Sequence, residues 1–182
     1  TGFSLGTSFE QFEDIFFSPS FSNYFESLKT SSSASDAKKK QKGEYFDSNF
    51  NYGLTLNKLN QNFQPSSGFK SSFYQEIPIY SDDFSLFNSF DYAKYFSPNE
   101  NAIISVRFLA KAINSLAGDD VRISKRVYLP GKRLKGFEFG KIGPKDGSDF
   151  VGGNYASALN FATTLPGLFS DLENVDFSLF FD

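Results

Sequence analysis

The side chains that could carry chemistry are concentrated in the stretch LKGFEFGKIGPKDGSDFVGGNYASALNFAT at 134–163. It holds Lys135 in a glycine-rich setting and the carboxylate pair Asp146 and Asp149, while a second pair lies upstream at Asp119–Asp120. Paired carboxylates could serve acid–base chemistry or calcium binding. Neither pair has the spacing of an EF-hand loop, so we interpret them as loop acids and predict no metal site.

Composition excludes most catalytic classes. The 182-residue chain has no Cys and no His, which removes imidazole or thiolate zinc sites, Ser-His-Asp and Cys-His nucleophiles, and thiol redox chemistry. Its formal charge of -3 gives no basic footprint for nucleic acid. We therefore expect no catalytic residues, no enzyme activity, no cofactor and no nucleic-acid partner.

Aromatic residues are the compositional outlier. The chain has 25 Phe and 9 Tyr but no Trp and no Met, although its mean hydropathy is below zero. This combination is typical of strands that are apolar on one face only. No apolar run reaches the ~18 residues of a transmembrane helix. The chain begins with Thr1 and stops at Asp182 inside an apolar alternation, so we expect both ends to be cuts in a longer protein.

Period-two alternation predicts the secondary structure. It is clearest at 44–56, where Phe46, Phe50 and Leu54 share one face and Asp47, Asn49 and Asn51 share the other. Similar patterns predict strands at 1–10, 17–28, 44–56, 69–78, 84–96, 102–114, 153–163 and 175–182. Between them we expect an acidic connection at 11–16, a solvated Ser- and Lys-rich loop at 29–43 and a tight turn at 97–101.

These strands fit two all-β architectures, a soluble sandwich and a membrane barrel. About eight strands of roughly ten residues match the length that a tilted strand needs to cross a bilayer. Arg107 and Lys111 share the face opposite the apolar one, and a polar lumen accepts such charges more readily than a dry core does. The connections 29–43 and 116–152 are long, whereas 97–101 is short. The pattern favours an antiparallel transmembrane β-barrel.

Three segments resemble a known family. They are GFEFGKIGPKDGSDFVGGNYASALNF at 136–161, NFQPSSGFKSSF at 62–73 and VDFSLFFD at 175–182. Together they resemble the C-terminal barrel of the bacterial surface antigen family, the BamA-type outer-membrane protein assembly factors. The resemblance covers essentially the whole chain. It implies that residues 1–182 are part of one sixteen-stranded barrel, spanning its sixth to thirteenth strands. The sixth extracellular loop would lie at about 116–152, and the periplasmic POTRA modules would lie outside this chain.

The resemblance also implies a site. In the family, an Arg-Gly-Phe motif at the tip of the sixth loop folds into the lumen and pairs with acidic and aromatic groups of the wall, including the aspartate of a Phe-x-Asp-x-Gly motif. The loop motif corresponds to Leu134, Lys135, Gly136 and Phe137. The wall motif begins at Phe180 and Asp182, which the alternation places on the inner face. The loop-to-strand motif comprises Gly143, Pro144, Gly152, Gly153 and Asn154.

One departure from the family affects this site directly. The motif arginine is Lys135 here, which keeps the charge but loses the planar fork that binds a carboxylate through two bonds. The expected anchor is therefore weaker, or Arg133 contributes to it. On the residues alone, a lysine in a glycine-rich loop is most often solvated.

The function that the resemblance implies is assembly of other β-barrel proteins in the bacterial outer membrane. Its partners would be outer-membrane lipid, client barrel proteins and, through the absent N-terminal modules, accessory assembly lipoproteins. Three alternatives remain open: a related TamA-like or two-partner secretion transporter, a porin-like passive channel, and an eight-stranded barrel closed by pairing of 1–10 with 173–182.

Overall fold

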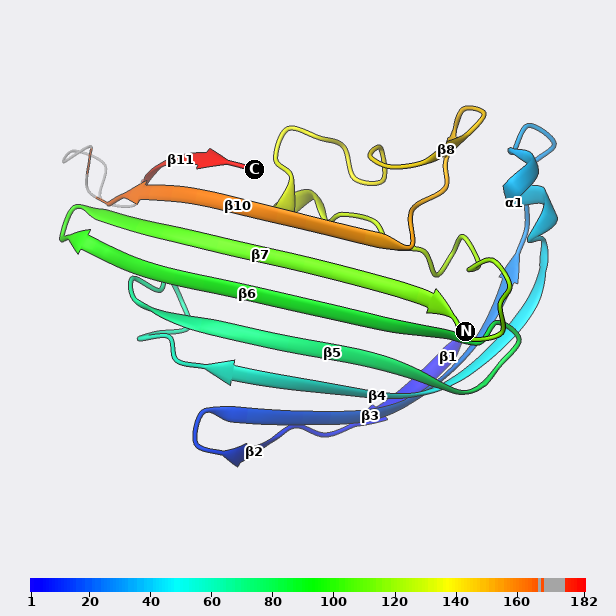
Figure 1. Cartoon of the computed structure of the whole chain (residues 1–182), viewed down its shortest axis with the longest axis horizontal. Helices are drawn as coiled ribbons and strands as arrows, with labels where there is room; N and C mark the ends of the chain where they lie inside the picture. The colour runs from blue at the N-terminus through cyan, green and yellow to red at the C-terminus, as the bar shows by residue number, and fades with distance from the viewer. Residues whose placement is uncertain (167, 169–175) are drawn as a thin grey trace.

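The computed structural model describes residues 1–166, 168 and 176–182. It is dominated by one antiparallel sheet of nine strands, which Figure 1 shows as a curved array of long strands lying side by side. The strands are β1 (Gly2–Gly6), β2 (Phe9–Phe12), β3 (Ile15–Leu28), β4 (Gly43–Asn57), β5 (Gly68–Ser81), β6 (Ser85–Asn99), β7 (Ala102–Ser115), β10 (Tyr155–Leu165) and β11 (Phe177–Phe181). The predicted antiparallel all-β fold is confirmed.

The strands are arranged as a meander. Their order is β1-β3-β4-β5-β6-β7-β10-β11. Both β1 and β2 pair with β3, β1 along residues 20–24 and β2 along residues 15–17. Because β1 pairs only with β3 and β11 only with β10 among the described residues, the sheet is not closed. The alternatives of a closed eight-stranded barrel and of a two-sheet sandwich are therefore both wrong.

Several predicted boundaries need correction. The predicted strand at 1–10 is broken at residues 7–8, and the expected acidic connection at 11–16 shrinks to a turn at Glu13 and Asp14, where Asp14 has a φ of 63°. The turn expected at 97–101 is shorter, because β6 continues to Asn99. The last strand begins at Phe177, and Val175, where we expected it to start, lies outside the described residues.

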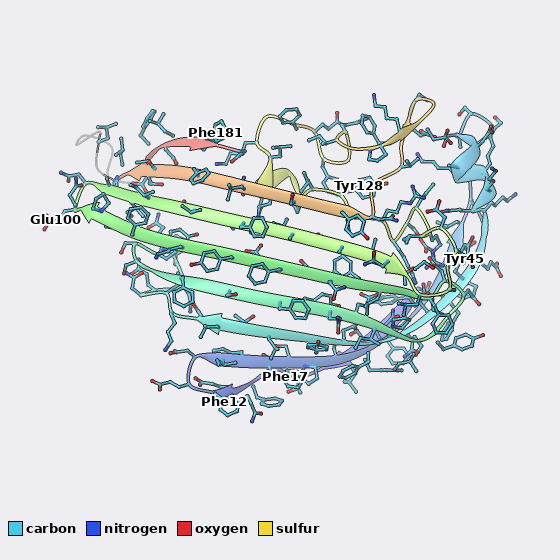
Figure 2. The ribbon with its side chains drawn as sticks, viewed as in Figure 1. Phe12, Phe17, Tyr45, Glu100, Tyr128 and Phe181 are labelled. Atoms are coloured by element: carbon cyan, nitrogen blue, oxygen red, sulfur yellow. The ribbon has the colours of Figure 1, made fainter. Side chains whose placement is uncertain are left out.

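The two longest connections that the structure describes lie at the same end of the sheet. At one end lie the short turns of β2–β3 and β6–β7; Figure 2 labels Glu100 in the second. At the other end lie the 29–42 segment and residues 116–154, which we call the long connection. It contains η1 (Gly131–Arg133), β8 (Lys145–Asp146) and β9 (Asp149–Phe150). The 29–42 segment, expected to be an unstructured solvated loop, contains the helix α1 (Asp36–Lys40).

The two faces of the sheet have opposite polarity. On the outer face, away from the long connection, aromatic and aliphatic side chains are exposed, including Phe50, Leu54 and Phe161. On the inner face, polar side chains are buried, and Asp47, Asn49 and Asn51 are each less than 5% exposed. This is the inverse of a water-soluble protein, and it is what a membrane barrel requires, because lipid contacts the outside.

Within the described residues, a small apolar core lies where the long connection meets the inner face. Ile113 of β7 packs there against Val121 and Val127 of the connection, with Phe87 and Ala156 beside them. Val127 and Gly153 exchange two backbone hydrogen bonds of 2.8 and 3.1 Å. These bonds join the first limb of the connection, residues 116–127, to its second limb, residues 144–154, before β10 begins.

No helix among the described residues is long and apolar enough to cross a membrane.

Candidate functional site

The candidate site is the long connection seated on the polar inner face of the sheet. Two clusters of charged side chains hold it there, one contributed by its first limb and one by the η1 turn. Both clusters lie in a setting that partly excludes water, so their hydrogen bonds are worth more than similar contacts at a surface.

The first cluster is centred on Asp47 of β4 and is called the Asp47 cluster. The Asp47 carboxylate, 5% exposed, accepts hydrogen bonds from the Arg122 guanidinium, from the Lys125 ammonium at 2.7 Å and from the Ser81 hydroxyl. Arg122 also stacks over the Tyr45 ring, with its guanidinium carbon 4.2 Å from the ring centroid. Two cations of the connection thus share one buried acid of the wall.

Neighbouring strands complete the Asp47 cluster. Lys125 Nζ also donates to the Asp83 carbonyl at 3.1 Å, and the Arg122 amide donates to the Asp83 carboxylate at 3.1 Å. Glu26 of β3 lies 3.4 Å from Arg122 Nε. The first limb of the connection is therefore fixed to β3, β4 and the β5–β6 turn together.

The second cluster is centred on Arg133 at the end of η1 and is called the Arg133 anchor. The Arg133 side chain is 6% exposed and pairs with the Asp91 carboxylate of β6. Asn160 of β10 accepts from Arg133 Nη1 at 3.4 Å, and its amide donates to the Arg133 carbonyl at 2.7 Å. Asn160 also donates to Asp182 at 2.9 Å, so it links the turn to the last described residue.

Lys135 lies beside the same wall, and its main chain and side chain make separate contacts there. Its backbone amide donates to Asp182 Oδ2 at 2.8 Å, and its ammonium lies 3.9 Å from the centroid of the Phe180 ring. The structure gives Lys135 no ion pair with Asp182; the charged side chain stacks on the ring while the main chain binds the carboxylate. The strand register places Phe180 opposite Ala162, on the inner face.

The other residues of the predicted loop motif are less enclosed. Leu134 is half-buried at the end of η1, Gly136 has a φ of +84°, and Phe137 is 60% exposed. The structure therefore brings the backbone of position 135 to the wall, together with the side chain of Arg133, and leaves the Phe137 ring outside the contact.

The predicted loop-to-strand motif frames the β8–β9 hairpin. Pro144, which follows Gly143, accepts a hydrogen bond from the Val151 amide at 3.0 Å and so closes the hairpin. Gly152 has a φ of +69°, and a Cβ there would lie 2.7 Å from the Tyr128 ring, so only glycine fits. Gly153 bonds Val127, and the Asn154 carbonyl accepts from Ile113 at 2.8 Å. These residues direct the chain from the connection into β10.

Three of the four paired carboxylates make contacts within the chain. Asp120 binds the Arg126 guanidinium at 2.7 Å. Asp146 and Asp149 bind backbone amides of the α1 segment. Within the described residues, no group of three or more His, Cys, Asp or Glu side chains is placed to hold a metal ion.

Sequence reasoning missed most members of both clusters. Alternation placed Asp47 on the polar face, but no spacing rule links Asp47 to Arg122, 75 residues away, or Asn160 to Arg133, 27 residues away along the chain. One usable signal for Arg133 was present in the sequence, namely that it directly precedes the predicted loop motif at 134–137. Asp91 gave no signal, because its strand carries several polar residues on the same face.

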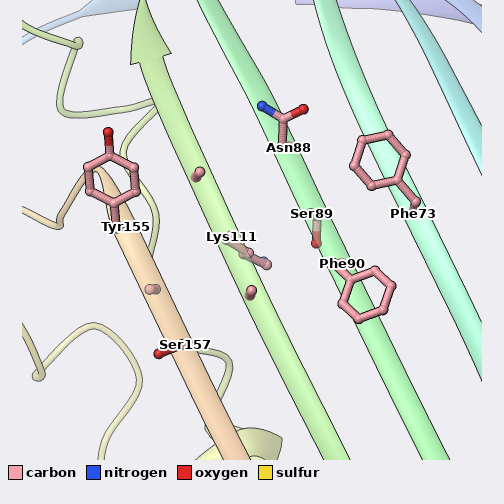
Figure 3. Close-up of a pocket in the computed structure, with 10 residues that line it drawn as sticks. Phe73, Asn88, Ser89, Phe90, Lys111, Tyr155 and Ser157 are labelled. Atoms are coloured by element: carbon pink, nitrogen blue, oxygen red, sulfur yellow. The ribbon is translucent and has the colours of Figure 1, made fainter.

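The outer face carries a shallow depression of about 370 Å³ (Figure 3). Its floor is formed by Ala110 and Ala112 of β7, and its walls by Phe90 and Tyr155. The depression is continuous with the aromatic surface. Lys111 is its one charged lining residue, and alternation along β7 places the Lys111 side chain on the face opposite Ala110 and Ala112, so the depression adds no chemistry to the site.

Inverted polarity, strands of 14 or 15 residues and a polar face covered by a long connection define part of an outer-membrane β-barrel. The particular family follows from comparison. Residues 2–182 match the model of the Omp85 superfamily domain, and the chain belongs to that superfamily. Its members are non-enzymatic assembly and transport factors that reside in the outer membrane.

A solved structure shows the same fold. The crystal structure of BamA from Haemophilus ducreyi lacking POTRA domains 1–3 superimposes with a TM-score of 0.86 at 19% sequence identity. The match covers 97% of this chain and 40% of that one, so the chain spans less than half the length of the matched structure. No curated protein sequence matches the chain significantly.

Proposed function

We propose that this chain is part of a BamA-like assembly factor that folds and inserts other β-barrel proteins into the outer membrane. Superfamily membership supports barrel insertion or secretion as the general role. The observation that carries the finer proposal is the Arg133 anchor, because it braces the long connection against the wall on the inner face, with the Arg133 side chain 6% exposed. A braced interior suits an assembly barrel better than an open pore.

The proposed domain organisation rests on the resemblance of the sequence to the assembly-factor family. The described strands correspond to the sixth to thirteenth of a sixteen-stranded barrel, and the long connection is its sixth extracellular loop. Client barrel proteins would be assembled in the surrounding lipid. Accessory assembly lipoproteins would bind through POTRA modules elsewhere in the complete protein.

The test is depletion of the complete protein in the cells that make it. The proposal expects the amounts of folded barrel proteins in the outer membrane to fall, as measured by quantitative mass spectrometry of membrane fractions. Wild-type protein should restore them, and so should Lys132→Met, which changes an exposed cation next to the anchor. The double variant Arg133→Met/Lys135→Ala should restore them incompletely.

Other outcomes point to the competing functions. If depletion leaves outer-membrane barrels unchanged and abolishes export of a single secreted protein, the chain is a transporter of the TamA-like or two-partner secretion kind. A large, stable single-channel conductance of the purified protein in planar bilayers would identify a porin-like channel, since a seated connection predicts small and unsteady currents.

A further inference from the structure

The α1 segment and the long connection contact one another at the loop-rich end of the sheet. Residues 35–41, which we call the clasp, lie between β3 and β4 in the chain but bind both limbs of the connection. Figure 1 shows α1 and the β8 hairpin at this same end of the molecule.

The clasp binds the second limb through the β8–β9 hairpin. The Asp149 carboxylate accepts a hydrogen bond from the Ser35 amide at 2.9 Å, and Asp146 accepts one from the Ala37 amide at 2.8 Å. Lys38 Nζ lies 3.1 Å from the other oxygen of Asp149. These acids satisfy amides that a short helix leaves without partners, in a place where the helix has no side-chain cap of its own.

The clasp binds the first limb through Gln41. The Gln41 side chain accepts a hydrogen bond from the Ile123 amide at 2.6 Å, and the Gln41 carbonyl accepts one from the Tyr45 hydroxyl at 2.9 Å. Ile123 lies between Arg122 and Lys125, which belong to the Asp47 cluster. The C-terminal end of the clasp therefore binds the segment of the connection that the Asp47 cluster holds against the sheet.

The hairpin itself is shaped for this contact. Asp146 and Asp149 face each other in the β8–β9 register, and the two residues between them form the turn. Gly147, with a φ of +58°, occupies the first position of that turn, where glycine is favoured. Both carboxylates are thereby presented on one short, rigid hairpin.

From this arrangement we propose that the clasp is a releasable ionic latch that ties the β8–β9 hairpin to the first limb and so keeps the long connection closed over the inner face. The ion pair of the hairpin has no buried member, since Asp149 is 26% and Lys38 is 34% exposed. Each cluster has at least one nearly buried charge, Asp47 at 5% and Arg133 at 6% exposed, so the hairpin pair is the weaker contact. The latch opens first, and its opening frees residues 136–150 while the Arg133 anchor stays in place.

The test is limited trypsin digestion of the complete purified protein in detergent micelles. Trypsin cleaves after lysine, and the clasp holds Lys38, Lys39 and Lys40, with Lys42 directly after it. Cleavage of a transiently opened segment follows the population of its open form. The double variant Asp146→Ala/Asp149→Ala should be cut in the clasp about ten-fold faster, because it loses hydrogen bonds of ordinary strength.

Two controls keep the test specific. Asp119→Ala removes an exposed acid from the same connection and should leave the rate unchanged. In an otherwise unaltered protein, Ala34→Cys/Ser148→Cys should be joined efficiently by a short bismaleimide, since the chain has no cysteine of its own. Equal cleavage of the double variant and wild type, or absence of the cross-link, would overturn the proposal. Neither readout depends on client assembly, so the latch and the proposed function can fail separately.

Discussion

Replacing Arg133 by methionine should loosen the long connection more than replacing Lys135 by alanine, although Lys135 is the residue that the sequence predicted for the motif. The Arg133 side chain is 6% exposed and pairs with Asp91, whereas the Lys135 side chain is exposed and only stacks on Phe180. Methionine keeps most of the bulk of arginine, so the change removes mainly the charge and its hydrogen bonds.

The magnitudes follow from these environments. A hydrogen bond between charged partners contributes about 1.5–3 kcal/mol, and a fully buried partner left alone would cost more. Asp91 is 42% exposed and can be rehydrated, so we expect a loss of about 2 kcal/mol, or roughly a 30-fold shift toward the undocked state. For Lys135→Ala the loss is an exposed cation–π contact of about 0.5–1 kcal/mol.

Hydrogen exchange at the amide of residue 135 measures this docking directly. That amide donates to Asp182 in the docked state, and it remains present in Lys135→Ala. Exchange should be about 30-fold faster in Arg133→Met and only a few-fold faster in Lys135→Ala. Lys132→Met serves as the matched control and should match wild type. If Lys135→Ala accelerated exchange more than Arg133→Met, the assignment of the anchor to Arg133 would be refuted.

Two further predictions concern the outer face and the latch. Phe50→Arg places a charge on the lipid-facing surface and should lower the unfolding free energy of the complete protein in lipid vesicles by about 2–4 kcal/mol near the bilayer midplane, as measured by urea titration. Phe50→Leu should change it much less, and equal effects would mean that this face does not contact lipid. For the latch, the backbone amide of Ser35 and then the Lys38 ammonium lower the pKa of Asp149 below its usual value. Its stabilising effect is complete above the unfolded pKa and is lost as the pH falls through the lowered folded-state pKa. Exchange at the Ser35 amide, corrected for its intrinsic rate, should therefore accelerate below about pH 4, and this pH response should disappear in Asp149→Asn.

The sheet was largely predictable because its polarity has a period of two. The faces of 44–56 could be assigned from the alternation of Phe46 and Phe50 with Asp47 and Asn51, and the register of β11 places Phe180 and Asp182 on the inner face. The break at residues 7–8 could not be predicted, since Thr7 and Ser8 continue the same alternation.

The charged contacts were not predictable, for a physical reason. A cation in an irregular loop can reach any acid on the inner face, and alternation fixes only which face a residue occupies. Helix α1 was not predictable either, because five residues are too few for a stable isolated helix and its stability depends on contacts with distant residues. Its amide partners, Asp146 and Asp149, lie 109 and 114 residues further along the chain.

The contact between Lys135 and Asp182 runs through a peptide group, and this has a consequence for genetics. Every amino acid except proline supplies the same N–H at position 135, so almost any codon there encodes the same tether. A screen for mutants with a strongly loosened connection would return changes at Asp182 and Arg133, whereas position 135 would contribute only weak effects unless proline were among the substitutions. Replacing arginine by lysine at position 135 therefore leaves the backbone hydrogen bond to Asp182 unchanged.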